Sequence, residues 1–355
     1  MNGIFQAFAV FLALTFSSYG CESQDSSLLD PIQGEWLIPK NEIYDGGPGK
    51  DGIPALLNPR FIAASEASYV GDDDLVIGVK IGNEIRAYPH PILDWHEIIN
   101  DDLGGTLLAI TYCPLTGSGI AWNRVLGNRT TTFGVSGLLY NSNLLPYDRA
   151  TNSNWSQMRL QCVNGELTRT TPTVHPVVET TWRTWRGMYP ASQVVSSQTG
   201  YARPYGSYPY GDYKTSSSLI FPVSQNDARL PRKERVLGIL VGNVTKVYRM
   251  GSFSEALTVV HDSLDGLDIV VAGSTAQNLA IAFERRLADG TILSFTPILN
   301  NLPVAMLDQE GTKWDIWGKA VEGPRTGLDL KPVRSYISYW FAWAAFYPGA
   351  EIHAN

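Results

Sequence analysis

Trp182-Arg183-Thr184-Trp185-Arg186-Gly187-Met188-Tyr189-Pro190 and Trp340-Phe341-Ala342-Trp343-Ala344-Ala345-Phe346-Tyr347-Pro348 decide the fold. Both tryptophans, the tyrosine and the proline recur at a constant separation of 158 residues. Within each stretch the aromatic residues are spaced i, i+3 and i+7, which is typical of one face of a helix. The sequence therefore predicts two copies of one aromatic helix, each packed against a core.

Similar matches continue upstream of the two stretches. Their separations are 160 and 161 residues, and the pairs are Gly78/Gly238, Asn83/Asn243, Tyr88/Tyr248, Asp101/Asp262 and Arg124/Arg285. A fixed period of this kind is the signature of an internal repeat. We predict an α+β, β-rich fold made of two tandem pseudo-repeats of one antiparallel-sheet-plus-helix unit. The N-terminal half would span residues 52–197 and the C-terminal half residues 234–355.

Apolar alternation and turn residues predict the elements of the N-terminal half. Gly82-Asn83 is a favoured two-residue turn between two predicted strands, 75–81 and 84–88. Pro91 is predicted to open a helix that runs to about Asn100, because proline suits the first helical position. The further predicted strands are 106–112, 120–126 and 130–135, and the aromatic helices are predicted at 180–189 and 337–347.

The chain ends and the segment between the halves have distinct compositions. Ile4 to Phe16 is almost wholly apolar, so residues 1–20 are predicted to be a signal peptide of an extracytoplasmic protein. Cys21 is a candidate lipid attachment site, with ordinary cleavage as the alternative, and such a lipid would be the chain's one membrane contact. Residues 21–51 are predicted to form a tether that ends in a Gly/Pro-rich loop. Residues 198–233, rich in Tyr, Pro, Gly and Ser, are predicted to be a linker over the surface.

Composition excludes some classes of protein. The chain has 355 residues, 44% apolar and 17% charged, with a net charge of −7, which is typical of a compact globular protein. It contains no run of Lys or Arg, so nucleic acid is rejected as a partner.

The two halves differ at chemically reactive positions. Cys113 stands opposite Ser274, His96 opposite Ala256 or Leu257, and Arg86 opposite Lys246. The glycine-rich turn after Cys113 loses both glycines in the C-terminal half. Positions found in only one half are better functional candidates than shared ones, so we predict a site around Cys113 and His96. The thiol needs positive charge nearby to become a thiolate, and Arg86 or His96 would supply it.

Several motifs resemble the domain of unknown function 3179 family. They include Ile53-Pro54-Ala55-Leu56, Trp95-His96-Glu97-Ile98-Ile99-Asn100-Asp101, Tyr112-Cys113-Pro114-Leu115-Thr116-Gly117-Ser118 and Tyr140-Asn141-Ser142-Asn143. The resemblance implies an exported or membrane-anchored protein of bacteria or archaea, with no established activity. Many members carry a second cysteine at the position of Thr116. Its absence here argues against an obligatory dithiol couple and against a metal site that needs both thiolates.

These residues are compatible with three alternative functions. In the first, the protein is a thiol-dependent enzyme with Cys113 as nucleophile and His96 as general base. In the second, Cys113 and His96 bind one copper or zinc ion. In the third, the protein is an envelope binding module that uses exposed aromatic residues. The candidate binding residues for a small molecule or anion are Arg86, Thr116, Gly117, Ser118, Asn141 and Arg149. Cys113 is either free or paired with Cys162, and the sequence does not indicate an oligomeric state.

Overall fold

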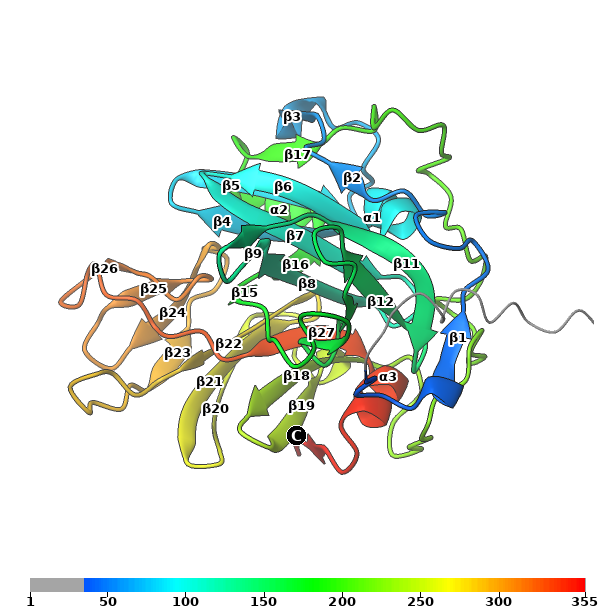
Figure 1. Cartoon of the computed structure of the whole chain (residues 1–355). Coiled ribbons are helices and arrows are strands. Elements are labelled where there is room, and N and C mark those ends of the chain that lie inside the picture. Colours follow the sequence, from blue (N-terminus) through cyan, green and yellow to red (C-terminus); the bar gives the residue numbers. More distant parts are fainter. Residues whose placement is uncertain (1–34, 355) are drawn as a thin grey trace, which may run out of the picture. The chain divides into compact units, whose positions relative to one another are not determined.

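The computed structural model describes residues 35–354. Within this range the chain is β-rich, with short helices between strands (Figure 1). The predicted signal peptide, Cys21 and most of the tether lie outside the described residues. None of the helices in the described range has the length and apolar character needed to cross a bilayer.

One sheet in each half shares the order of four strands, and the sheet of the N-terminal half has β3 as a fifth strand. In the N-terminal half it is β16-β4-β5-β17-β3, and in the C-terminal half it is β27-β18-β19-β28. Within these two sheets, β5 with β17 and β19 with β28 are parallel neighbours, and the other paired strands are antiparallel. The bounds are β3 Phe61–Ala63, β4 Leu75–Ile81, β5 Glu84–Pro89, β16 Val178–Thr181, β17 Gln193–Val195, β18 Arg235–Val241, β19 Val244–Arg249, β27 Ser335–Tyr339 and β28 Glu351–Ile352.

A second sheet in each half is built on three consecutive antiparallel strands. These are β6-β7-β8, flanked by β2 and β15, and β20-β21-β22. Their bounds are β2 Leu56–Leu57, β6 Ile98–Leu103, β7 Thr106–Cys113, β8 Ser118–Asn123, β15 Val174–His175, β20 Thr258–Leu264, β21 Leu267–Ser274 and β22 Leu279–Glu284.

The remaining strands form antiparallel meanders. The order is β1-β11-β12-β13-β14 in one sheet, β23-β24-β25-β26 in another, and β9 pairs with β10. Their bounds are β1 Ile43–Asp45, β9 Val125–Leu126, β10 Arg129–Thr130, β11 Phe133–Tyr140, β12 Asn143–Asp148, β13 Asn154–Ser156, β14 Gln161–Asn164, β23 Phe295–Pro297, β24 Val304–Asp308, β25 Lys313–Asp315 and β26 Ala320–Glu322. The 3-10 turns within residues 35–354 are η2 Lys40–Glu42, η3 Ala64–Glu66 and η4 Met250–Ser252.

The predicted hairpin is confirmed, because β4 and β5 flank Gly82, which has a φ of 57°. The helices are shorter than predicted: α1 His90–His96, α2 Trp182–Met188 and α3 Trp340–Phe346. The expectation that the first helix reaches Asn100 was wrong. Glu97 takes a φ of 55°, which ends the helix, and Ile98 starts strand β6.

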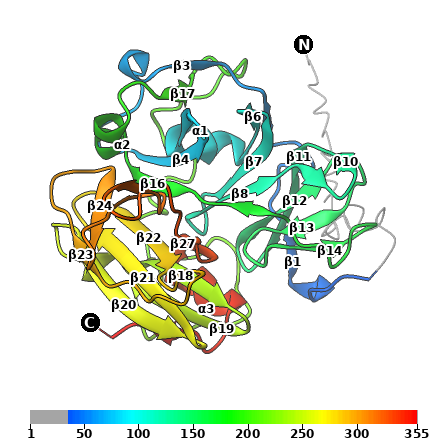
Figure 2. The ribbon, with the colours of Figure 1, turned by 90° about the vertical axis from the view of Figure 1, so that its left-hand side faces the viewer.

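A tryptophan on each aromatic helix packs on a strand glycine. A Cβ on Gly78 would lie 1.9 Å from the Trp185 ring, and one on Gly238 would lie 2.2 Å from the Trp343 ring. Figure 2 shows α2 beside β4 and α3 close to β18. These glycines are therefore required by the close approach of an indole ring.

Two hydrophobic clusters contain residues from both halves. Trp340 and Trp343 join a cluster with Trp122 and Trp155, while Trp185 joins a cluster with Trp314 of the opposite half. Each aromatic helix thus buries its apolar face partly against the other half. Two further clusters lie within one half each, one around Tyr88 and Ile110 and the other around Tyr248 and Ile269.

The linker adopts no helix or strand between residues 198 and 233, and it is hydrogen-bonded onto the N-terminal half. The Tyr208 hydroxyl donates to the Pro114 carbonyl (3.2 Å), and the Tyr213 hydroxyl donates to the Leu115 carbonyl (3.0 Å). Both carbonyls belong to the turn that follows Cys113. The linker therefore covers the strand end on which the sequence places the site.

Candidate functional site

Cys113 ends strand β7 and is buried, with 1% of its surface exposed. Its Sγ lies 3.6 Å from the Ser142 carbonyl oxygen. The following turn is held from the other half of the chain, because the Tyr339 amide donates to the Thr116 carbonyl (2.7 Å). Linker and C-terminal half together bury a thiol that the sequence alone would leave at an exposed strand end.

The two described cysteines are free, so the alternative of a Cys113–Cys162 disulfide was wrong. The Cys162 Sγ instead contacts the Asn154 and Asn164 carbonyl oxygens at 3.3 and 3.4 Å. Burial, followed by the charge of Glu97, raises the pKa of Cys113 to about 11. The expectation of a thiolate activated by Arg86 or His96 is not met, because the ionisable group that most affects this thiol is acidic.

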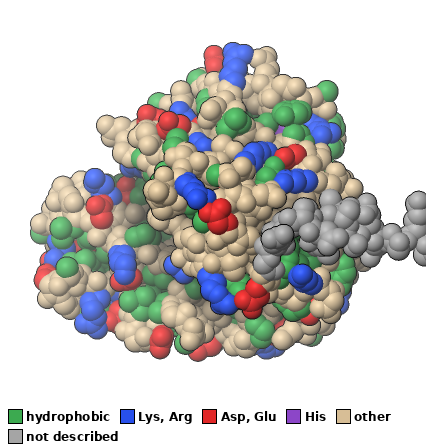
Figure 3. Space-filling view, viewed as in Figure 1, with side chains coloured by type: hydrophobic (Ala, Val, Ile, Leu, Met, Phe, Trp, Pro, Cys, Tyr) green, Lys and Arg blue, Asp and Glu red, His purple; other side chains and the backbone are tan. Residues whose placement is uncertain are grey.

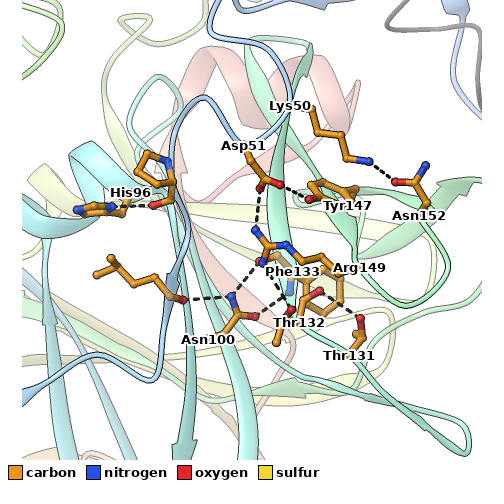
Figure 4. A network of polar contacts seen from close by, with 12 residues as sticks. Lys50, Asp51, His96, Asn100, Thr131, Thr132, Phe133, Tyr147, Arg149 and Asn152 are labelled. Carbon is orange, nitrogen blue, oxygen red and sulfur yellow. Dashed lines mark hydrogen bonds and ion pairs between the residues drawn. The ribbon is translucent and has the colours of Figure 1, made fainter. Parts of the chain in front are cut away.

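Both ring nitrogens of His96 are occupied. Nδ1 lies 2.7 Å from the Pro54 carbonyl, to which it must donate, and Nε2 lies 2.7 Å from the Tyr205 hydroxyl. Burial lowers the pKa of His96, which fits this neutral tautomer. The imidazole thus joins the N-terminal loop, defined here as residues 46–55, to the linker. Figure 4 shows its bond to the loop. The imidazole makes no hydrogen bond to Cys113 among the described residues.

Arg86 is engaged by acidic and apolar partners on β5, β6 and β3. Its Nη1 donates to Asp101 Oδ2 (2.7 Å) and to the Asp102 carbonyl (2.8 Å), and its guanidinium lies 4.2 Å from the centre of the Phe61 ring. In the C-terminal half, Lys246 pairs with Asp262 at the same distance, 2.7 Å. An equivalent pair in both halves favours a structural role for Arg86.

Thr116 and Ser118 belong to a closed hydrogen-bond network. Their hydroxyls lie 2.8 Å apart, and Asn143 Nδ2 donates to both, at 3.0 and 3.2 Å. Ser118 also donates to Gln157 Oε1 (2.7 Å). Because the members are buried and bonded to one another, they fix the turn and offer little to a ligand.

Gly117 and Asn141 shape the backbone around the thiol. Gly117 has a φ of 60°, and a Cβ there would lie 3.2 Å from the Tyr339 ring. Asn141, with a φ of 51°, accepts the Ser224 amide of the linker through Oδ1 (2.7 Å). Both residues therefore serve the fit between the N-terminal half and the segments that cover it.

Arg149 fastens the N-terminal loop to the β11–β14 sheet. Its Nη2 donates to Asp51 Oδ1 (2.7 Å) and its Nη1 to the Phe133 carbonyl (3.0 Å). Tyr147 also donates to Asp51. Figure 4 shows these contacts together with those of Asn100, which binds the Leu56 carbonyl at the end of the same loop.

The residue that stands out is Glu97, which the sequence reasoning did not select. Only 5% of it is exposed, and no ion pair to it occurs among the described residues. Burial raises the pKa of Glu97 to about 8, against a hydrogen bond with Tyr210, and the charge of Asp94 raises it further. A carboxylic acid is thereby held largely protonated at neutral pH.

Glu97 lines a cavity of about 300 Å³, called here the Glu97 cavity. The N-terminal loop, the turn after Cys113, the β11–β12 hairpin and the linker supply its walls. The lining residues include Ile53, Asp94, Leu115, Leu139, Leu144 and Phe221. Mostly apolar walls with a few convergent polar groups are typical of a small-molecule site.

Asp94 is the second acid of this cavity. Its Oδ2 accepts from Lys214 Nζ of the linker (3.0 Å), whereas its Oδ1 is buried without a partner in the described structure. Burial raises the pKa of Asp94, and Lys214 opposes this. Asp94 lies on α1 and Glu97 directly follows the helix, and both side chains line the cavity.

A metal centre is not supported. No three His, Cys, Asp or Glu side chains within residues 35–354 converge as ligands. With His96 already bonded twice, the pair predicted for copper or zinc lacks a free imidazole. Of the aromatic residues on which the binding-module hypothesis relies, Trp182, Trp185, Trp340 and Trp343 are buried, whereas Tyr201 of the linker is exposed.

A family model described as "Protein of unknown function (DUF3179)" matches residues 50–350. The chain belongs to the DUF3179 family. No curated protein and no solved structure matched it. The match covers both halves and the linker of this DUF3179 protein, so every wall of the Glu97 cavity except its first few loop residues lies inside the family region.

A signal for Glu97 was present in the sequence of this DUF3179 protein. Glu97 stands between His96 and the apolar pair Ile98-Ile99, where a charged side chain interrupts a buried run. A carboxyl group buried in such a run either pairs with a cation or has a raised pKa, because burying an unpaired charge is costly. The helix expected up to Asn100 concealed this signal, because it placed Glu97 on the polar face.

Proposed function

We propose that this protein binds a small molecule in the Glu97 cavity and acts on it by proton transfer, with Glu97 as general acid or base. The observation that carries the proposal is a buried carboxyl without a paired cation, facing a 300 Å³ cavity. With its pKa raised to about 8, Glu97 can both give and take a proton near neutral pH.

The walls favour such chemistry because they keep water away from the acid. The N-terminal loop and the linker cover the cavity, and His96 bonds to both of them. A low-dielectric enclosure strengthens every electrostatic interaction inside it. Access then requires one of these two segments to move, as in enzymes whose loops open to admit substrate.

Titration and probe binding test the proposal. Carbon NMR of labelled glutamate side chains should show one carboxyl that titrates near pH 8 and disappears in Glu97→Gln. Acetophenone, as an apolar hydrogen-bond acceptor, should perturb amide signals of cavity residues, and Leu144→Trp should abolish this by filling the space. Thr258→Val, at the corresponding site of the C-terminal half, is the control. Normal acidic titration of every glutamate would contradict the proposal.

A second candidate is thiol-dependent catalysis, favoured by the closeness of Glu97 to Cys113. Here the ionised form of Glu97, which prevails above about pH 8, accepts the Sγ proton in place of His96, and the thiolate attacks an electrophile bound beside Leu115. Iodoacetamide labelling followed by mass spectrometry tests it, with buried Cys162 as the internal reference. Cys113 should label faster than Cys162, and Glu97→Gln should change only the Cys113 rate. Equal resistance of both thiols would leave Cys113 a core residue.

Two proposals concern origin and location. Descent of both halves from one duplicated unit is supported by the shared strand orders, by the sequence matches and by the Gly78/Trp185 and Gly238/Trp343 contacts.

The apolar run Ile4 to Phe16 supports export, with Cys21 as the site of cleavage or lipid attachment. Mass analysis of the mature N-terminus from the native host tests the second proposal.

A further inference from the structure

The Glu97 cavity holds two acids but offers them little positive charge. Lys214 is engaged with Asp94 Oδ2, and its Nζ also lies 4.0 Å from the centre of the Tyr208 ring. Arg203 contributes to the wall, but it is exposed and its guanidinium lies 5.7 Å from the centre of the Trp95 ring. The nearby groups Cys113, Tyr210 and His90 are neutral at neutral pH, because burial raises the pKa of the first two and lowers that of His90 to about 3.

Asp94 Oδ1 is an acceptor that the protein does not satisfy. The residue is 5% exposed, belongs to the cavity wall, and has no hydrogen-bond donor on this oxygen among the described residues. A buried acceptor left without a donor is costly. A ligand with N–H groups would remove that cost, whereas a carboxylate or a plain hydrocarbon would not.

Resting on the proposed function, we infer that the substrate of the Glu97 cavity carries a protonated amine, bound between Asp94 Oδ1 and the Glu97 carboxyl. Its apolar body lies against Leu115, Leu139 and Leu144. An ammonium group has three donors and no acceptor, which matches two neighbouring carboxyls. A molecule with one small ring and an aminomethyl group has a size compatible with the cavity.

Binding of this class of ligand is linked to protons. Glu97 is mostly protonated below its pKa of about 8, and a bound ammonium favours its ionised form. At pH 7 the complex therefore releases a proton from Glu97, and affinity rises with pH until Glu97 is ionised in the free protein. Above that pH the release vanishes, and affinity falls once the amine itself loses its proton.

Three probes with the same ring and different head groups test the inference: benzylamine, benzyl alcohol and benzoate. Isothermal titration calorimetry at pH 7, in two buffers of different ionisation enthalpy, measures affinity and proton release in the wild-type protein. We expect benzylamine to bind tightest, with release of about one proton. Glu97→Gln and Asp94→Asn should each weaken it about 10-fold or more, whereas Glu166→Gln, on the surface, should change nothing.

The outcomes separate this inference from the proposed function. If benzyl alcohol or benzoate binds the cavity more tightly than benzylamine, the amine assignment fails and the site stands. Benzylamine binding without proton release, or unchanged in both variants, also overturns the assignment, and the wild-type measurement holds even if Asp94→Asn does not fold. Failure of all three probes to bind at millimolar concentration would overturn the inference and the proposed function together.

Discussion

Corresponding strand ends in the two halves contain different chemistry on similar backbones. Thr258 and Ser274 of the C-terminal half are 161 residues beyond Glu97 and Cys113. The Thr258 hydroxyl donates to the Gly273 carbonyl (3.2 Å), and the Ser274 hydroxyl donates to the Glu255 carbonyl (2.6 Å). Both hydroxyl groups thus donate to backbone carbonyls of their own half. Glu97, by contrast, has no paired charge among the described residues and faces a cavity. The comparison teaches that the strand geometry does not require an acid there.

The comparison assumes that both halves pack their helices alike, and glycine substitutions test this most severely. Gly78→Val and Gly238→Val should each place side-chain atoms inside an indole ring and cost about 4 kcal/mol or more. Chemical denaturation, or the soluble yield if the variants do not fold, measures the loss. If one variant retains wild-type stability, the two halves do not share this packing.

The second prediction concerns stability against pH. Because the folded-state pKa of Glu97 is raised from 4.5 to about 8, its contribution to stability is complete at acidic pH and is lost as pH rises through that interval. Glu97→Gln lacks this loss, so it should exceed wild type by about 3 kcal/mol near pH 8 and by much less near pH 5. Urea unfolding at both pH values measures the difference, and Thr258→Val should show no such trend. Parallel pH profiles for wild type and Glu97→Gln would rule out a buried acid.

His96 sharpens the contrast further, because the C-terminal half has Ala256 or Leu257, and no imidazole, at the matching position. His96→Ala removes the bonds to Pro54 and Tyr205 and should cost about 1–2 kcal/mol. It should also speed protease cleavage within residues 198–233, because the linker loses an anchor. Limited proteolysis with mass spectrometry checks this. Unchanged cleavage would mean that Tyr208, Tyr213 and Lys214 hold the linker without His96.

The smallest effect is expected at Arg86. Lys246 performs the matching ion pair with Asp262, so Arg86→Lys should keep a pair with Asp101 and cost less than about 1 kcal/mol. Thermal unfolding measures this, and ligand binding should be unchanged. If Arg86→Lys lost binding of the acetophenone probe while its stability was intact, Arg86 would be a binding residue, and the structural role inferred for it would be wrong.

The distribution of charge was also accessible from the sequence. On the face in Figure 3, acidic and basic side chains are interspersed, as the absence of Lys/Arg runs predicts.

The sequence predicted least well the contacts between segments that are distant in the chain. Cys113 and His96 were predicted to lie together, but His96 is hydrogen-bonded to a loop and a linker 42 and 109 positions away and makes no hydrogen bond to Cys113 among the described residues.

The sequence by itself determined the β-rich α+β class, the Gly82-Asn83 hairpin and the two aromatic helices, because these depend on periodicity and turn chemistry over a few residues. Only the tertiary structure decided which side chain is chemically unusual. The pKa of Glu97 depends on how completely water is removed from it, and the groups that remove water come from the N-terminal loop, the β11–β12 hairpin and the linker. Desolvation is a sum over neighbours in space, and local sequence patterns do not contain it.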